Sequence, residues 1–189
     1  MNNLFAIPSK SVDLKHLDIK AIKEYCLSQV AKVTKHYSNE GGNHSEFFDL
    51  TTPVLKPLCT DILNIGKQFC DEIGTERVTH IQNMWSIKNK HGDYNREHIH
   101  PNSFFSGVFY PGDEYPDDIG DLSLIHPGFK EMNYDWDFKQ KNYNEYNSLV
   151  MNIKPERGRL MIFPSYVAHF VYINRNKNID RLVISFNLK

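Results

Sequence analysis

The sequence predicts an α+β protein in which helices come first and a sandwich or barrel of antiparallel strands follows. Over the first third of the chain, apolar residues recur at steps of three and four, which is the period of a helix with one buried face. From Arg77 onward the chain breaks into short segments rich in β-branched and aromatic residues, separated by Gly, Pro, Asn and Asp. A run of helices followed by a run of short strands is typical of the α+β class.

Two helices are expected within residues 1–74. The apolar stripe of the first consists of Ile22, Cys26, Val30, Val33 and Tyr37. The turn at Gly41-Gly42-Asn43 ends this helix, and a second stripe runs from Leu55 to Ile73 and is closed by Gly74. We expect both helices to support the β-structure by packing on one of its faces.

Seven strands are expected after residue 75, at residues 78–88, 104–110, 121–125, 148–154, 159–163, 168–173 and 181–188. The last strand alternates cleanly, with Leu182, Ile184, Phe186 and Leu188 on one face and Arg181, Val183, Ser185 and Asn187 on the other. Successive side chains of a strand point to opposite faces. We therefore expect the aliphatic face to pack on the core and the face with Arg181 to point into an interior cavity.

The bulk properties describe one globular domain over residues 1–189 and exclude several classes of function. With 22 basic and 23 acidic residues the net charge is −1, so the chain has no bulk attraction for a phosphate backbone or an anionic membrane. Its three cysteines cannot all pair, so neither a disulfide framework nor a zinc knuckle is expected. We expect no secretory leader, and the sequence shows no apolar run of the roughly 20 residues that span a membrane. We expect a cytoplasmic protein without nucleic-acid or membrane partners.

Residues 111–147 form a long connection that differs from its surroundings. They hold nine acidic residues against three basic ones, and five aromatic residues lie between Tyr134 and Tyr146. A connection of this length within a compact domain is usually functional or disordered, and its aromatic content argues against disorder. We interpret it as a flap over one end of the strands, with a solubilising surface insertion as the alternative.

The candidate metal ligands are three of the nine histidines. In His98-Ile99-His100, alternate residues of an extended segment share a face, so both imidazoles point the same way. His169 follows a strand that ends at the turn Pro164-Ser165, and in an antiparallel barrel a late strand can lie opposite an early one. The three histidines would then meet at the mouth of the barrel. Three protein ligands on one side of an ion leave other positions free for substrate, as a catalytic metal requires.

Arg181 follows His169 by twelve residues and opens the final strand. An arginine inside a barrel needs an anionic partner, and a carboxylate suits its planar fork of donors. The alternatives are a bound carboxylate ligand and a salt bridge to an interior Asp or Glu. The inward positions assigned above offer no acid.

Taken in order along the chain, a set of short motifs resembles the 2-oxoglutarate–Fe(II) oxygenases of bacteria and marine phages, in the prolyl-hydroxylase-like superfamily. The motifs are Trp85, Gly92-Asp93-Tyr94, His98-Ile99-His100-Pro101-Asn102-Ser103, Ser106-Gly107-Val108-Phe109-Tyr110, Pro155 with Gly158, Phe163-Pro164-Ser165, His169 and Arg181. The opening Leu4-Phe5-Ala6-Ile7-Pro8 is also similar to the family's start. Only residues 111–147 lack clear markers.

This resemblance implies a double-stranded β-helix, a jelly-roll or cupin-like barrel, with iron at its open end and 2-oxoglutarate as co-substrate. The implied metal ligands are His98, His100 and His169. The residues implied to bind the distant carboxylate of 2-oxoglutarate are Arg181, Tyr110 and Ser185. The implied activity is that of a dioxygenase, in which O₂ hydroxylates a small-molecule or peptide substrate while 2-oxoglutarate is converted to succinate and CO₂.

Two positions depart from the family's pattern. The wider superfamily has His-x-Asp and a distant His, and here His100 stands at the Asp position. Either three histidines bind the iron, or only one of the His-x-His pair does so and Asp121 or Glu97 completes the set. Some relatives place a serine two residues after the arginine, where this chain has Val183, so Ser185 is a less direct match.

Two rival hypotheses use the same three histidines. The first is a metal-binding barrel of another enzyme class, such as a cupin-like isomerase or a zinc hydrolase. The second is a binding or structural module that keeps the barrel and the metal without turnover. An interior arginine argues against the zinc hydrolase, which has no need of a cationic partner for a dicarboxylate. The histidine at the Asp position keeps the module without turnover open.

Overall fold

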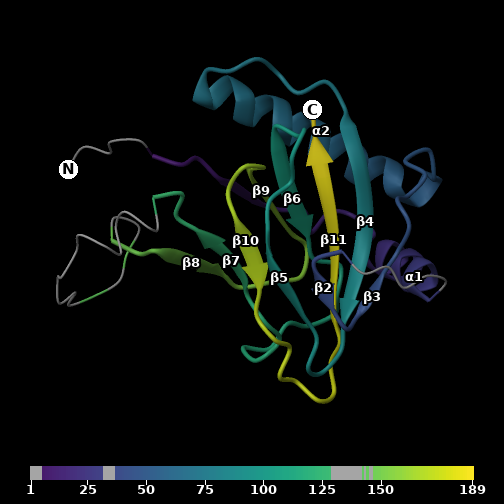
Figure 1. Cartoon of the computed structure of the whole chain (residues 1–189). Helices are drawn as coiled ribbons and strands as arrows, with labels where there is room; N and C mark the ends of the chain where they lie inside the picture. The colour runs from purple at the N-terminus through teal and green to yellow at the C-terminus, as the bar shows by residue number, and fades with distance from the viewer. Residues whose placement is uncertain (1–5, 32–36, 129–141, 143, 145–146) are drawn as a thin grey trace.

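The computed structural model describes residues 6–31, 37–128, 142, 144 and 147–189. This part of the chain forms two antiparallel β-sheets with two α-helices packed outside the larger sheet (Figure 1). Side chains of both sheets, among them Val108, Leu122, Val171 and Val183, pack together between them. The predicted α+β class with two helices on one face is confirmed.

The larger sheet contains six strands, and every neighbouring pair is antiparallel. In spatial order they are β1 (Lys10–Asp13), β9 (Arg159–Pro164), β6 (Phe105–Phe109), β11 (Arg181–Leu188), β4 (Ile81–Asn89) and β3 (Asn43–His44). The central position of β11 gives it two buried faces. Ile184 and Phe186 enter the core beneath the helices, whereas Val183 points toward the smaller sheet. The alternation predicted for the last strand is therefore present.

The smaller sheet contains five antiparallel strands. In spatial order they are β2 (Asn39–Glu40), β5 (Tyr94–His98), β10 (His169–Val171), β7 (Leu122–Ile125) and β8 (Val150–Ile153). The chain passes from β2 in this sheet to β3 in the larger one through Gly41 and Gly42. Both glycines have a positive φ, 67° and 65°, which allows this tight turn.

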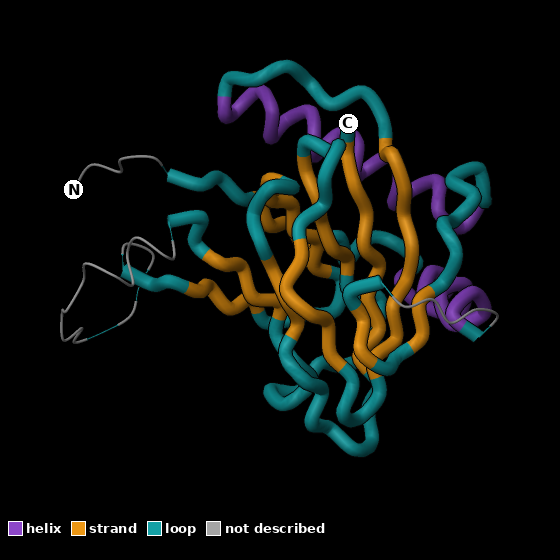
Figure 2. Tube along the Cα trace, in the orientation of Figure 1, coloured by secondary structure: helices purple, strands orange, loops and turns teal. Residues whose placement is uncertain are grey.

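Both helices are limited by recognisable end signals. The Asp18 carboxylate accepts a hydrogen bond of 3.0 Å from the Ala21 N–H and caps α1 (Ile19–Val30). α2 (Lys56–Ile73) follows the 3-10 helix η1 (Pro53–Leu55) and ends at Gly74, which adopts a left-handed φ of 73°. Both helices lie against the larger sheet (Figure 2), and their buried side chains form one apolar core with it. Burying these apolar faces is the main favourable term for the arrangement.

The first third of the chain differs from the sequence prediction in two ways. α1 ends at Val30, and Tyr37 is not helical and is 55% exposed beside β2, so the helix is shorter than its apolar stripe predicts. Val33 lies outside the described residues. Residues 1–74 also contribute three strands that the sequence does not predict, and these strands are two to four residues long. Strands of that length depend on pairing with distant partners rather than on a pattern of their own.

The expected flap at 111–147 begins as a fixed part of the fold. The Tyr115 hydroxyl donates to the carbonyl of Leu182 on β11 at 2.5 Å and accepts from the Gly112 N–H at 2.7 Å. Asp113 pairs with Arg157 at 2.9 Å. β7 then belongs to the smaller sheet, while residues 129–141, 143 and 145–146 lie outside the described residues.

The cysteines lie on the helices, as expected. All three are free thiols, and burial raises the pKa of Cys26 to about 12. Such a thiol stays protonated at neutral pH and acts as a small apolar side chain. Among the described residues, no helix combines the length and the apolar character needed to cross a membrane.

Candidate metal centre and adjoining cavity

His98 and His169 face each other where β5 and β10 pair. His98 is the last residue of β5 and His169 is the first of β10, and the two are direct partners in the antiparallel register. Directly opposite residues place their side chains on the same face of a sheet. The two ring centroids lie 4.3 Å apart. The turn at Pro164-Ser165 leads from the larger sheet to β10 and thus places His169 beside His98.

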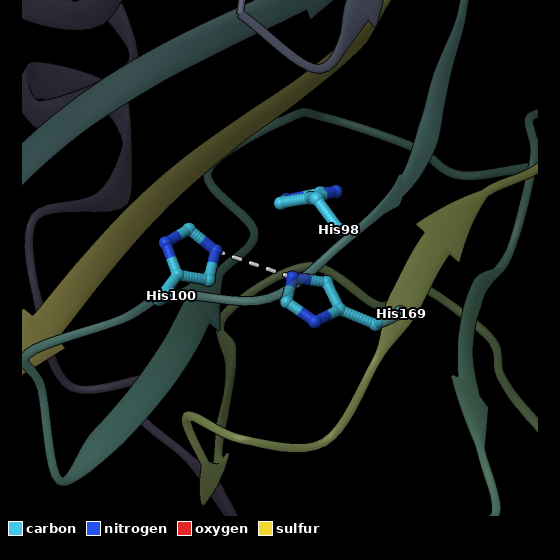
Figure 3. Close-up of side chains that lie close together, drawn as sticks. All are labelled: His98, His100 and His169. Atoms are coloured by element: carbon cyan, nitrogen blue, oxygen red, sulfur yellow. Dashed lines mark hydrogen bonds between the residues drawn. The ribbon is translucent and has the colours of Figure 1, made fainter.

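His100 lies in a loop, two residues beyond the end of β5. Its backbone N–H donates to the carbonyl of Ser165 at 3.1 Å. Asn102, with a positive φ of 65°, then turns the chain toward β6. The Nε2 atom of His100 is 3.2 Å from the Nε2 atom of His169 (Figure 3). One ligand atom from each of the three predicted histidines lies within 4.8 Å of the other two, so the fold brings them together.

The arrangement of the imidazoles suits a shared divalent ion. Two nitrogens bound to one ion at ~2.1 Å each are about 3 Å apart, which is close to the 3.2 Å between His100 and His169. The Nδ1 atom of His98 faces the carbonyl of Arg96 at 2.7 Å, and that of His169 faces the carbonyl of Val167 at 2.9 Å. A carbonyl accepts the Nδ1–H, which leaves the lone pair on Nε2 for a metal.

Burial favours the uncharged form of all three imidazoles. Burial lowers the pKa of His98, against a smaller raising effect of its backbone hydrogen bond. Burial together with the nearby His98 lowers the pKa of His100 to about 4 and that of His169 to about 3. The neutral form is the one that binds a metal, so binding does not require the release of a proton to solvent.

Neither Asp121 nor Glu97 belongs to the histidine cluster within the described residues. Glu97 is exposed, and Asp121 lies near Arg181. Burial raises the pKa of Asp121, while the charges of Lys154 and Arg181 act in the opposite direction. The described part of the chain therefore offers three histidines and no carboxylate as the ligand set.

Arg181 is buried, with 1% of its surface exposed. Its Nε–H donates to the carbonyl of Gly120 at 3.0 Å, and its guanidinium carbon lies 5.5 Å from the centre of the Tyr110 ring. No carboxylate forms a salt bridge with it in the part of the chain that the structure describes. A buried guanidinium without a counter-ion is costly, so this end of the cavity fits an anionic ligand.

The other two residues implied for the carboxylate site occupy different positions. Ser185 lines the cavity together with Arg181, whereas Tyr110 is not part of the cavity wall and contacts Arg181 instead. The Tyr110 hydroxyl is buried without a hydrogen-bond partner among the described residues, as is the indole N–H of Trp85. Burial raises the pKa of Tyr110, against the lowering effect of the Arg181 charge. Of these two donors, the Trp85 indole N–H belongs to a residue of the cavity wall and can donate to a bound polar group.

One cavity of about 830 Å³ contains the three histidines and Arg181 in its wall. This volume is typical of a ligand site. Its outer part is lined by Tyr37, Phe47 and Ile99, which are 55%, 57% and 50% exposed. Apolar side chains that remain this exposed beside a polar cluster are typical of a surface that receives a ligand.

Two contacts at this site were not predicted from the sequence. Asn187 was placed on the cavity face without a role, and its side-chain amide contacts the His100 ring. Gly120 holds Arg181 through its backbone carbonyl, which no side-chain motif can reveal. Gly120 has a φ of 92°, and a Cβ there would lie 2.3 Å from the Tyr172 carbonyl oxygen, so both conformation and space require glycine.

Several solved structures share this fold at low sequence identity. A prolyl-4-hydroxylase from Pseudomonas putida is 12% identical with a TM-score of 0.72, over 97% of this chain and 93% of its own. The α-ketoglutarate-dependent epimerase SnoN from nogalamycin biosynthesis is 11% identical with a TM-score of 0.70, over 97% and 78%. A viral collagen prolyl hydroxylase from Paramecium bursaria Chlorella virus-1 is 12% identical with a TM-score of 0.58, over 95% and 94%. The predicted double-stranded β-helix is confirmed by this likeness.

No curated protein sequence matches the chain. A family model does match, over residues 83–187, and it is described as "Putative 2OG-Fe(II) oxygenase". The matched range covers more than half of the chain and contains the three histidines, Arg181 and Asn187. This chain therefore belongs to the 2OG-Fe(II) oxygenase family.

Proposed function

We propose that this protein is an Fe(II)- and 2-oxoglutarate-dependent dioxygenase that hydroxylates a small-molecule or peptide substrate. One observation carries the proposal. A cluster of three neutral histidines and a buried arginine without a carboxylate partner line the same cavity. This combination suits a dicarboxylate such as 2-oxoglutarate. One end of the ligand would chelate the metal, and the other end would bind the arginine. The overall reaction consumes O₂, 2-oxoglutarate and substrate, and it yields succinate, CO₂ and the hydroxylated product.

The three histidines would hold the iron through their Nε2 atoms. His98 and His169 come from paired strands, so their separation is fixed by the register of the sheet. The carbonyls of Arg96 and Val167 fix the tautomer and the orientation of these two rings. When bound, the iron and 2-oxoglutarate supply the oxidative chemistry, and the protein supplies orientation and a dry cavity.

Arg181 would bind the distant carboxylate of 2-oxoglutarate. Its Nε–H is engaged by the Gly120 carbonyl, which leaves the two terminal nitrogens of the guanidinium for the ligand. Ser185 lies on the same face of β11 two positions beyond Val183, and its hydroxyl would add one hydrogen bond. The unpaired Tyr110 hydroxyl, in contact with Arg181, would donate another. A charged hydrogen bond of this kind contributes about 1.5–3 kcal/mol.

The substrate would occupy the outer part of the cavity. Tyr37, Phe47 and Ile99 give this part an apolar rim, while Arg96 on the same rim is paired with Glu40 at 2.8 Å. A rim of this kind favours an apolar group on the substrate, and the exposed Glu97 adds one negative charge beside it. We further propose that the acidic, aromatic segment within residues 111–147 covers the cavity or reads the substrate, and that residues 1–74 support the barrel within a single domain.

The proposal is tested by measuring succinate formed from 2-oxoglutarate with and without added Fe(II), in the absence of a substrate. We expect slow, Fe(II)-dependent succinate release. His169→Ala should abolish both iron binding and succinate release. Arg181→Ala should leave iron bound and raise the 2-oxoglutarate concentration required by roughly 10- to 150-fold, the equivalent of 1.5–3 kcal/mol. Equal loss of iron in both variants would contradict these roles, and absence of both turnover and 2-oxoglutarate binding would refute the proposal.

A zinc hydrolase or a non-catalytic metal barrel remains the second candidate. One observation favours it, because three histidines without a carboxylate are also the ligand set of hydrolytic zinc. Hydrolytic zinc has no use for a buried, unpaired arginine, which favours the oxygenase. Zinc-dependent ester hydrolysis without any succinate release would support the hydrolase, and metal binding without either activity would support the non-catalytic barrel.

A further inference from the structure

The three histidines differ in what holds the ring nitrogen that points away from the cluster. For His98 and His169 this nitrogen, Nδ1, faces a backbone carbonyl, 2.7 Å and 2.9 Å away. A carbonyl can only accept, so these two rings are fixed in the tautomer with an unprotonated Nε2, which in His98 lies 3.4 Å from the Ser38 hydroxyl. His100 has no carbonyl on its Nδ1 among the described contacts. Its Nδ1 atom instead faces the side-chain amide of Asn187, whose Nδ2 lies 3.5 Å away.

Asn187 is buried, with 4% of its surface exposed, and its amide is held from two further sides. Its Nδ2 donates to the Asn83 side-chain oxygen of β4 at 2.8 Å, and its Oδ1 accepts from the Ser106 hydroxyl of β6 at 2.8 Å. The Ser106 hydroxyl also lies 2.9 Å from the hydroxyl of Ser165. A polar network across three strands of the larger sheet thus ends at Asn187, directly behind His100.

The same network approaches His100 from its backbone side. The carbonyl of Ser165 accepts the His100 backbone N–H at 3.1 Å. His100 lies beyond the end of β5, so no strand register fixes its ring as it does for His98 and His169. The position of the third ligand is therefore set by contacts with Ser165 and Asn187 rather than by sheet geometry. The orientation of a metal ligand in a loop depends more on the residue hydrogen-bonded to its far ring nitrogen than does the orientation of a ligand on a strand.

With the amide as it lies, Asn187 donates to Nδ1 of His100, which places the His100 proton on Nε2. That proton then points to the Nε2 of His169 across 3.2 Å. A metal on the same two nitrogens requires the other tautomer of His100, with the proton on Nδ1 and an acceptor behind it. Asn187 can become that acceptor by a half-turn of its amide. If Asn83 turns in the same way, each contact with Asn83 and Ser106 again pairs a donor with an acceptor.

We propose that Asn187 is the positioning residue of His100 and that its amide sets which tautomer this histidine presents to the metal. With an ion in the cluster, the Asn187 carbonyl accepts from Nδ1–H of His100. Without one, the Asn187 amide N–H donates to Nδ1, and His100 is hydrogen-bonded to His169. The inference rests on the proposed function for the identity of the metal as iron, but its test uses cobalt and needs no turnover.

The experiment compares Asn187→Asp with Asn187→Leu by titration with Co(II), following the absorbance of the bound metal. The Asp carboxylate can only accept, so it holds His100 in the metal-binding tautomer, and we expect cobalt to bind at least as tightly as in the wild type. Leu has a similar size and cannot hydrogen-bond, and loss of an outer partner typically weakens metal affinity 10- to 100-fold. If Asn187 serves only to fill space, the two variants will behave alike. Either both will bind cobalt with the wild-type affinity, or both will lose cobalt binding and also show a lower melting temperature.

A second readout reports the tautomer directly. NMR of ¹⁵N-histidine-labelled, metal-free protein should show the His100 proton on Nε2 in the wild type and on Nδ1 in Asn187→Asp. The same His100 tautomer in both proteins would overturn the inference, whether or not cobalt binds. Cobalt binding that depends on Asn187 as described, without any succinate release by the iron-loaded protein, would refute the proposed function and leave this inference standing.

Discussion

At the scale of single residues, the buried arginine says more about the ligand than the three histidines do. Histidine clusters hold several metals and serve several chemistries. Arg181 is different, because a guanidinium at 1% exposure without a salt bridge among the described residues, with only the nearby charge of Asp121, favours an anionic ligand. The unpaired Tyr110 hydroxyl beside it points to the same kind of ligand. Burying these unpaired polar groups therefore lowers the stability of the ligand-free protein, and a bound dicarboxylate would offset that loss.

This cost makes Tyr110→Phe a sensitive test. Removing a buried hydroxyl that has no partner should raise the melting temperature of the ligand-free protein, because an unsatisfied buried polar group costs about 1–3 kcal/mol. The same change should weaken 2-oxoglutarate binding by roughly 10- to 150-fold, the equivalent of the 1.5–3 kcal/mol of one hydrogen bond to a charged group. Thermal unfolding and a 2-oxoglutarate titration of the metal-loaded protein measure the two effects. A lower melting temperature with unchanged affinity would show that the hydroxyl is structural.

The sequence revealed these residues unequally. The His-x-His spacing predicted that His98 and His100 lie together, although His100 lies in a loop beyond β5 and not on a shared strand face. The alternation of the last strand placed Arg181 in the cavity. The contact between Asn187 and His100 joins residues 87 apart in the chain, and that between Gly120 and Arg181 joins residues 61 apart. Local periodicity carries no information about such pairs. They follow from the order in which the strands assemble.

At the scale of elements, sequence patterns predicted seven of the eight described strands after residue 75 and missed β5 and the short strands of the first third. Every strand predicted after residue 75 is present, with ends that shift by a few residues. β1, β2 and β3 are defined by their pairing with β9, β5 and β4, and they are too short for a period of two to be visible. The apolar stripe beyond Val30 was similarly misleading, because Tyr37 lines the outer cavity instead of a helix.

The turn before β7 offers a prediction at this scale. Gly120 and Gly92 have nearly the same φ, 92° and 90°, but a Cβ at Gly120 would collide with the Tyr172 carbonyl, whereas one at Gly92 meets nothing within 4 Å. In both Gly→Ala variants, the unfavourable backbone conformation alone should lower the free energy of unfolding by about 1–2 kcal/mol. Gly120→Ala should lower the free energy of unfolding further, because the turn must move to make room for the Cβ. This movement should also displace the Gly120 carbonyl that accepts from Arg181.

Denaturant unfolding and a 2-oxoglutarate titration of the two variants check this prediction. Gly92→Ala is the matched control for the effect of φ, and its affinity for 2-oxoglutarate should be that of the wild type. Equal stability and equal affinity of the two variants would mean that the Gly120 turn does not position Arg181.

At the scale of the whole molecule, the two sheets contribute different parts of the site. The smaller sheet supplies His98 and His169, and the larger sheet supplies Arg181 and Ser185 from β11. His100, in the loop between β5 and β6, connects the two through Asn187. A dicarboxylate that binds the metal at one end and Arg181 at the other would therefore join one sheet to the other. Its contribution to stability should appear only when both attachment points are present.

We expect this dependence to be visible in thermal unfolding with Ni(II) in place of iron, which prevents turnover. A ligand at 100 times its dissociation constant adds about 2.7 kcal/mol, which corresponds to roughly 5–10 °C for a chain of this size. Ni(II) should raise the melting temperature of the wild type, and 2-oxoglutarate should raise it further only when Ni(II) is present. Arg181→Ala should keep the Ni(II) effect and lose the 2-oxoglutarate effect, whereas His169→Ala should lose both. A stabilisation by 2-oxoglutarate that is equal with and without the metal, or equal in wild type and Arg181→Ala, would contradict a ligand that bridges the two sheets.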